Sequence, residues 1–200
     1  MSPDLRTPSR RTAITIGLGA ISSHGLSRAA LAQTSDPYAI LDDPEVRNPF
    51  EWAEAIAQLW RRGDRLQAAF WYYVFQIRSR PWAEADMAQT GGSGAAALRS
   101  AITYALGAPI NEWLGSDPAT WRDTGARAIA FEKRLPLHAA RPEGIDEATW
   151  ARMTETARAG HEAGFDQVWR QYSFADLEAR RRQAGLYVGP LQDPGQPLRW

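Results

Sequence analysis

The chain has 200 residues, with 23 basic and 23 acidic side chains and no cysteine. The missing cysteines exclude disulfide bonds, thiol catalysis, iron–sulfur clusters and thiolate zinc sites. The balanced charge argues against nucleic acid and anionic membrane surfaces as partners, because both require a basic protein surface.

The opening segment has the composition of a cleavable export signal. Arg10 and Arg11 precede residues 13–26, which contain no Asp, Glu, Lys or Arg, and small residues then lead to Ala32 and Gln33. This order is typical of a signal peptide cleaved between Ala32 and Gln33. A membrane anchor is the alternative, but the apolar run is shorter than the roughly 20 residues that a spanning helix needs.

Ser9-Arg10-Arg11-Thr12 resembles the start of a twin-arginine (Tat) signal, although Ala13 and Thr15 replace the Phe and Lys of that consensus. The apolar run at residues 13–26 is only mildly hydrophobic, and Arg28 adds a positive charge after it. Both features favour export by the twin-arginine route. The general secretory route is the alternative. The resemblance covers residues 1–32 and implies that residues 33–200 fold before export and act in the periplasm or outside the cell.

Removal of residues 1–32 takes away four arginines and one aspartate, which leaves 168 residues with 19 basic and 22 acidic side chains, a net charge of −3. A chain of this length is one ordinary domain. Its slight acidity predicts no nucleic-acid partner, and we expect no membrane-spanning segment in it. The oligomeric state is left open.

The first helices follow from capping residues and apolar spacing. Residues 33–48 are predicted to be irregular, and Asn48 is predicted to cap a helix that Gly63 ends. Asp64 is predicted to cap a second helix, which runs to about Arg80 before Pro81 stops it. This hairpin at residues 50–80 resembles a tetratricopeptide or Sel1 unit, but no repeat at a fixed period indicates a solenoid.

The second of these helices is apolar around most of its circumference, from Leu66 to Ile77. Such a helix is buried on most sides, so we expect it at the centre of the domain. A strand over Phe70–Phe75 is the alternative, because aromatic residues favour strands. The length of the segment favours the helix.

The rest of the chain predicts more helices and no strand. Residues 81–92 are predicted to form a loop. Ser93 is predicted to cap a helix that Gly107 ends, and residues 108–115 are predicted to form a short helical piece. Longer helices are expected after Asp117 and after Asp146.

A capping box at Ser173 and Asp176 predicts the last helix, which Gly185 ends, and residues 186–200 are expected to be irregular. The prediction is an all-α fold, a single compact bundle of about six or seven helices with an irregular C-terminal tail.

His161 is a weak candidate for a general base, because it lies on the apolar stripe of a long helix. A zinc site needs three or four ligands, and the only other histidine after the signal is His138, so we predict no metal and no cofactor. A core histidine is the more conservative interpretation. Glu112 is a second weak catalytic candidate, although acids beside helix starts, such as Asp117, usually cap helices.

A ligand or partner surface is assigned to the aromatic helix and to the short helical piece after it: Trp71, Tyr72, Gln76, Arg78, Asn111 and Trp113. For the run from Phe70 to Phe75, burial in the core is the favoured alternative. Gln76 is expected to be buried, and either to pair with the backbone of residues 109–113 or to face a ligand.

No motif for catalysis, metal binding or phosphate binding stands out. The leading hypothesis is therefore a non-catalytic exported protein that binds another protein, of the immunity, chaperone or adaptor kind. An exposed apolar groove rimmed by arginine and acid would favour it. The alternatives are a hydrolase that uses carboxylates and His161, which needs a carboxylate within hydrogen-bond distance of that ring, and a carrier of a small ligand.

Overall fold

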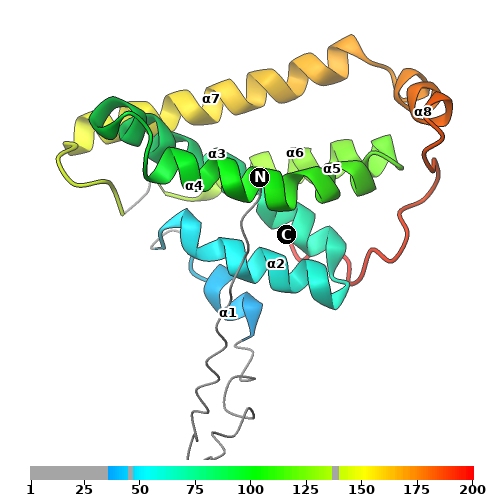
Figure 1. Ribbon diagram of the computed structural model, residues 1–200, viewed down its shortest axis with the longest axis horizontal. Coiled ribbons are helices and arrows are strands. Elements are labelled where there is room, and N and C mark those ends of the chain that lie inside the picture. Colours follow the sequence, from blue (N-terminus) through cyan, green and yellow to red (C-terminus); the bar gives the residue numbers. More distant parts are fainter. Residues whose placement is uncertain (1–35, 45–46, 137–139) are drawn as a thin grey trace, which may run out of the picture. The chain divides into compact units, whose positions relative to one another are not determined.

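Helix α3, Arg65–Thr90, is the central element of the computed structural model, which describes residues 36–44, 47–136 and 140–200. Four helices pack around it: α2 (Trp52–Arg62), α4 (Ala95–Ile102), α6 (Pro118–Arg134) and α7 (Glu147–Gln171). Figure 1 shows α7 along one side of the bundle and α2 on the other. Phe70, Trp71 and Phe75 of α3 are fully buried, so the prediction of a central buried helix is confirmed.

The first described element, α1 (Pro37–Leu41), corrects the prediction that residues 33–48 are irregular. Asp36 caps this short helix by accepting a hydrogen bond from the Tyr38 backbone N–H at 3.1 Å, and Leu41 is buried in the core. Proline at the first helical position loses no hydrogen bond, which is why Pro37 starts a helix here.

The expected hairpin of α2 and α3 is present, but the side chain of Asp64 does not cap α3 as predicted, because its Oδ1 accepts from the Gln196 backbone N–H instead. Asn48 caps the 3₁₀ turn η2 (Pro49–Glu51) that leads into α2, as predicted, with its side chain 3.0 Å from the Phe50 backbone N–H. Gly63 ends α2 with a φ of 89°, in the left-handed region that favours glycine.

The prediction that Pro81 ends the central helix is wrong, because α3 continues through it to Thr90. A proline inside a helix costs about 3 kcal/mol, so packing must offset this. Trp82 packs edge-to-face on Trp150 of α7, with ring centroids 5.5 Å apart, and Asp86 accepts hydrogen bonds from the start of α4. Tertiary contacts therefore keep residues 81–90 helical where a loop was expected.

Ser93 does not cap α4, and Gly107 does not end the helical segment. The carboxylate of Asp86 caps α4 instead, accepting from the backbone N–H of Gly94 at 3.0 Å and of Ala96 at 2.9 Å. A π-helical turn, η3 (Thr103–Gly107), then joins α4 to α5 (Ala108–Leu114) without a break. Gly107 is needed for close packing, because a Cβ there would lie 2.1 Å from the Tyr72 hydroxyl.

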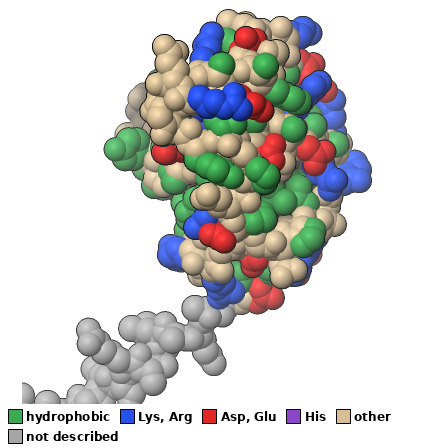
Figure 2. Space-filling view, turned by 90° about the vertical axis from the view of Figure 1, so that its right-hand side faces the viewer, with side chains coloured by type: hydrophobic (Ala, Val, Ile, Leu, Met, Phe, Trp, Pro, Cys, Tyr) green, Lys and Arg blue, Asp and Glu red, His purple; other side chains and the backbone are tan. Residues whose placement is uncertain are grey.

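The caps predicted in the second half are confirmed. Asp117 caps α6 and Asp146 caps α7, each accepting from the backbone N–H three residues on. Ser173 and Asp176 form the expected capping box of α8 (Phe174–Gln183). Figure 2 shows the side of the molecule on which α8 lies in Figure 1, where apolar side chains are interspersed with basic and acidic ones.

The tail after α8 is irregular, as predicted, and largely exposed, but Leu191, Leu198 and Trp200 pack against the core. Two backbone carbonyls of the tail accept hydrogen bonds from the bundle. Gln192 O accepts from Trp113 Nε1, and Pro194 O accepts from the Leu66 backbone N–H. Trp200 then stacks on Phe70, with ring centroids 5.5 Å apart and an interplanar angle of 7°.

The domain is an all-α bundle, and the described residues contain no strand. No helix within the described ranges is both long and apolar enough to cross a bilayer. Arg10 and Arg11 of the predicted signal, and Ala32 and Gln33 at its predicted cleavage site, lie outside the described residues.

Candidate ligand-binding groove beside α7

Two residues of the predicted ligand surface belong to the core instead. Trp71 has no exposed area and Tyr72 only 2%. The Trp71 ring packs on Trp52 and Trp200, with centroids 5.8 and 5.0 Å away. Side chains enclosed on all sides cannot meet a ligand, so the favoured alternative of core packing is correct for these two residues and their assignment to a binding surface is not.

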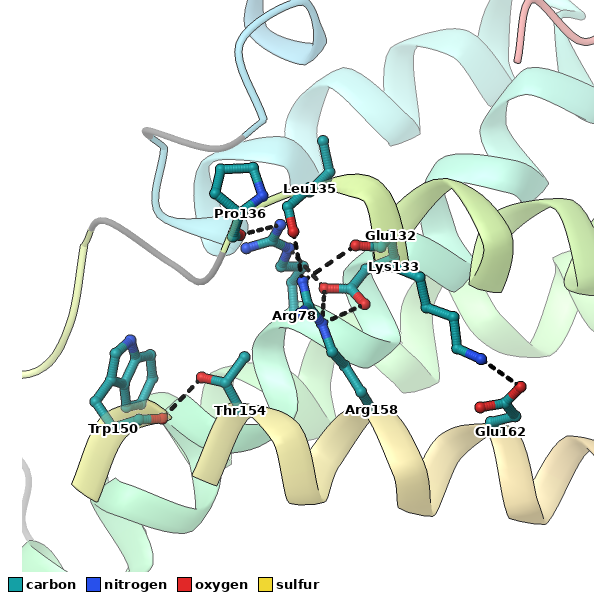
Figure 3. A network of polar contacts seen from close by, with 9 residues as sticks. All are labelled: Arg78, Glu132, Lys133, Leu135, Pro136, Trp150, Thr154, Arg158 and Glu162. Atoms are coloured by element: carbon teal, nitrogen blue, oxygen red, sulfur yellow. Dashed lines mark hydrogen bonds and ion pairs between the residues drawn. The ribbon is translucent and has the colours of Figure 1, made fainter. Parts of the chain in front are cut away.

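Arg78 is also buried, in a charge network that joins three helices (Figure 3). Its Nε lies 3.0 Å from Glu132 Oε1 on α6, and Arg158 Nε on α7 lies 2.8 Å from Glu132 Oε2. The Arg78 guanidinium also donates to the Pro136 carbonyl at 3.0 Å. Arg78 therefore has a structural role, and its assignment to a ligand surface is wrong.

Gln76 is half-buried and pairs with side chains of the α4–η3 segment, not with the backbone of residues 109–113. Its Nε2 donates to Thr103 Oγ1 at 3.0 Å, and its Oε1 accepts from Arg99 Nη2 at 2.6 Å. Gln76 therefore pairs within the protein, as one of the two interpretations predicted, but its partners are Thr103 and Arg99 and not the backbone of residues 109–113.

Glu112 and Trp113 line a hollow of about 340 Å³ between α5 and the tail. Glu112 is exposed there, and the Trp113 indole donates to Gln192 O at 2.8 Å. His161 does not line this hollow, so the two weak catalytic candidates do not share a site. Asp117 caps α6, as the conservative interpretation predicted.

His161 and Asn111 do meet, in a second hollow of about 330 Å³ between α7 and the helices α3, α5 and α6. We call this hollow the α7 groove and define it by its lining residues, which are Tyr73, Arg80, Asn111, Trp121, Gly160, His161, Gly164, Phe165, Val168 and Trp169.

Three polar side chains that line the α7 groove, those of Tyr73, Asn111 and Trp121, are hydrogen-bonded to each other. The Tyr73 hydroxyl donates to Asn111 Oδ1 at 2.7 Å and accepts from Trp121 Nε1 at 2.6 Å. Burial raises the pKa of Tyr73, so the hydroxyl keeps its proton. These bonds fix the ring of Trp121, which packs edge-to-face on Trp169 with centroids 5.7 Å apart.

Glycines of α7 create the space in the groove. A Cβ at Gly164 would meet no atom within 4 Å, so a side chain there would project into open space. A Cβ at Gly160 would lie 3.4 Å from the Arg80 guanidinium, which shows how closely that group approaches α7.

The groove continues at Arg80 into a neighbouring hollow of about 390 Å³, lined also by Ala83, Glu84, Met87 and Arg99. Arg80 and Glu84 form an ion pair at 2.8 Å, and both are partly exposed. The groove thus has an aromatic part and a charged end.

His161 lines the α7 groove together with Arg80 and is half-buried. Burial lowers its pKa to about 4, with smaller contributions from the charges of Arg80 and Arg99. Among the described residues, no carboxylate is hydrogen-bonded to its ring, and no three metal-ligating side chains cluster together. The imidazole is therefore neutral at pH 7.

Acid should destabilise the protein through His161. A histidine in an unfolded chain has a pKa of about 6.5, so between pH 6.5 and 4 the unfolded state binds a proton that the folded state does not. The free energy of unfolding therefore falls as the pH falls through this range, by about 2–3 kcal/mol. Urea unfolding of the wild type and of His161→Gln from pH 7 to pH 4 measures this loss. An equal loss in the two proteins would contradict the assignment to His161.

Several groove residues were not singled out from the sequence, namely Tyr73, Arg80, Trp121, Phe165 and Trp169. The available signal was the pair Gly160 and Gly164 within a long helix, followed by the apolar cluster Phe165, Val168 and Trp169. Comparison of the chain with models of protein families, with curated proteins and with solved structures finds no match.

Proposed function

We propose that the protein is an exported, non-catalytic binding protein and that the α7 groove is its ligand site. The observation behind the proposal is an open, aromatic-lined hollow in which Tyr73, Asn111 and Trp121 are hydrogen-bonded to each other and the buried indole N–H of Trp169 has no hydrogen-bond partner among the described residues. An apolar hollow with a few convergent polar groups is typical of ligand sites. The export part of the proposal is supported by the sequence alone, through Arg10, Arg11 and the small residues before Gln33.

The electrostatics of the groove favour binding over general-base catalysis. A general base works best when its pKa is near the working pH, whereas the pKa of His161 is lowered to about 4. The carboxylate that a hydrolase would need beside this ring is not among the residues that line the groove. These features support the binding proposal over the hydrolase alternative.

The size of the groove favours a small ligand over a partner protein. Its volume of about 330 Å³ lies at the lower end of the roughly 300–1,000 Å³ that small-molecule sites occupy. A partner protein is the second candidate, because the groove is apolar and rimmed by Arg80 and Glu84, and because Val168 in the groove and Phe174 beyond it are 39% and 37% exposed. A stable protein interface, however, buries over 1,000 Å², much more than this hollow provides.

Filling the groove with a side chain tests the proposal. We expect the wild type to bind the neutral fluorescent probe N-phenyl-1-naphthylamine at one saturable site, and Gly164→Leu to weaken this binding at least about tenfold, because a leucine side chain fills the space. Leucine also favours helix over glycine, so the variant should be more stable by about 0.5–1 kcal/mol. Loss of binding would then not be caused by unfolding.

The matched control is Ala163→Leu, which adds a similar side chain to the exposed side of the same helix turn. It should leave the affinity for the probe unchanged. Absence of saturable binding by the wild type, or equal affinity of the wild type and Gly164→Leu, would refute the proposed site.

A further inference from the structure

We propose that the ligand of the α7 groove is an organic anion with an aromatic body, and that its acidic group binds at Arg80. This inference rests on the proposed function, because it names the chemical class that the same groove takes.

The charged end of the groove has an excess of positive charge. Arg99 donates to three neutral acceptors, which are Ser79 Oγ at 3.1 Å, Gln76 Oε1 at 2.6 Å and Gln76 O at 3.3 Å. Within the described part of the chain, no carboxylate lies at ion-pair distance from Arg99, and Glu84 is the only acid that lines either hollow. Two guanidinium groups therefore share one carboxylate.

Arg80 is the group best placed to meet a ligand. It lines both hollows, its guanidinium lies against Gly160 of α7, and its bond to Glu84 is a partly exposed contact. An exposed ion pair contributes little to stability, so a ligand acid can share or replace it at small cost. Arg99 is half-buried behind it, and its charge is less screened by water than that of a surface group.

The aromatic part of the groove defines the body of the ligand. Trp121, Phe165 and Trp169 present ring faces and edges, and no acidic side chain lies among the groove's lining residues. Aromatic rings pack well on such surfaces in edge-to-face or offset geometry. Clusters of aromatic residues also bind organic cations, but Arg80 and Arg99 would repel a cation here. The aromatic rings alone would accept a cation, a neutral molecule or an anion, and the positive charges of Arg80 and Arg99 favour the anion.

Three ligands of one shape and different charge test the inference, each by displacement of N-phenyl-1-naphthylamine: 2-naphthoate, 2-naphthamide and 2-naphthylmethylamine. We expect 2-naphthoate to bind at least about tenfold more tightly than the amide, the effect of a charge-assisted hydrogen bond, and the amine to bind most weakly. Added salt should weaken only the binding of the anion.

Two substitutions should act in opposite directions. Arg80→Gln should lower the affinity for 2-naphthoate to that for the amide, and Glu84→Gln should raise it, because the competing acid is removed. The affinity for 2-naphthamide should change in neither variant. Arg61→Gln is the control, since it removes an exposed arginine of α2 that pairs with Glu54 outside the groove.

The outcomes separate the two proposals. If the neutral probe binds and Gly164→Leu blocks it, but the three ligands displace it equally or not at all, the groove is a binding site and the inference of an anion is wrong. Tighter binding of the amine than of 2-naphthoate would also overturn the inference. If the neutral probe does not bind to the wild type, the proposed function fails as well.

Discussion

Replacement of Glu132 by glutamine is expected to lower the free energy of unfolding by about 3–5 kcal/mol. The Glu132 side chain is 1% exposed and holds the guanidinium groups of Arg78, which is 0% exposed, and of Arg158, which is 17% exposed. Glutamine keeps the shape but removes the negative charge, so a buried positive charge is left without compensation. Domains are stable by only about 5–15 kcal/mol, so this loss should be evident in urea unfolding monitored by circular dichroism.

The control for this substitution is Glu54→Gln, which removes the carboxylate of an exposed ion pair with Arg61. Exposed pairs contribute about 0–1 kcal/mol, so the control should unfold nearly like the wild type. If Glu132→Gln were as stable as this control, the network in Figure 3 would not hold α3, α6 and α7 together.

Replacement of Trp200 by alanine is expected to cost about 3 kcal/mol, although this residue ends an irregular tail. The indole stacks on Phe70 and packs edge-to-face on Trp71 and Phe131, with centroid distances of 5.5, 5.0 and 5.8 Å. Removal of a large aromatic side chain from a core costs about 3–5 kcal/mol, and the partial exposure of Trp200 places it at the low end of this range.

The same unfolding measurement on Leu186→Ala separates core packing from a general effect of the tail. Leu186 lies in the same tail and is 40% exposed, so its truncation should change the free energy of unfolding by less than about 0.5 kcal/mol. Similar losses for the two variants would mean that Trp200 does not anchor the tail in the core.

The sequence was sufficient to predict elements that depend on local chemistry. Caps at Asn48, Asp117, Asp146 and Ser173 were predicted correctly because a capping side chain bonds to backbone within three residues of itself. The central position of α3 also followed from its apolar circumference, since such a helix needs neighbours on all sides.

The errors occur where contacts distant in the sequence override local preference. Pro81 lies within a helix because α4 and α7 hold the segment that follows it, and Gly107 lies within one because the Tyr72 ring packs against it. The interpretation of Arg78 as a surface residue failed for the same reason, because its partner Glu132 is 54 residues away. Single-residue patterns contain no information on such pairs.

The groove was predicted only in part. His161 was singled out because it lies on an apolar stripe, and Asn111 as part of a ligand or partner surface, and the structure places both in the lining. The aromatic wall was missed because tryptophans on helical stripes are more often core residues than ligand contacts. Only the packing of α7 over α3 and α6 determines which of the nine tryptophans face an open hollow.

The most direct test of the groove as a ligand site is the nuclear magnetic resonance spectrum of the tryptophan indole N–H groups during titration with N-phenyl-1-naphthylamine. We predict that the signals of Trp121 and Trp169 shift with a common binding curve, while those of Trp52 and Trp71 in the core do not move. Shifts at Trp113 without shifts at Trp121 and Trp169 would place the ligand beside the tail and contradict the account.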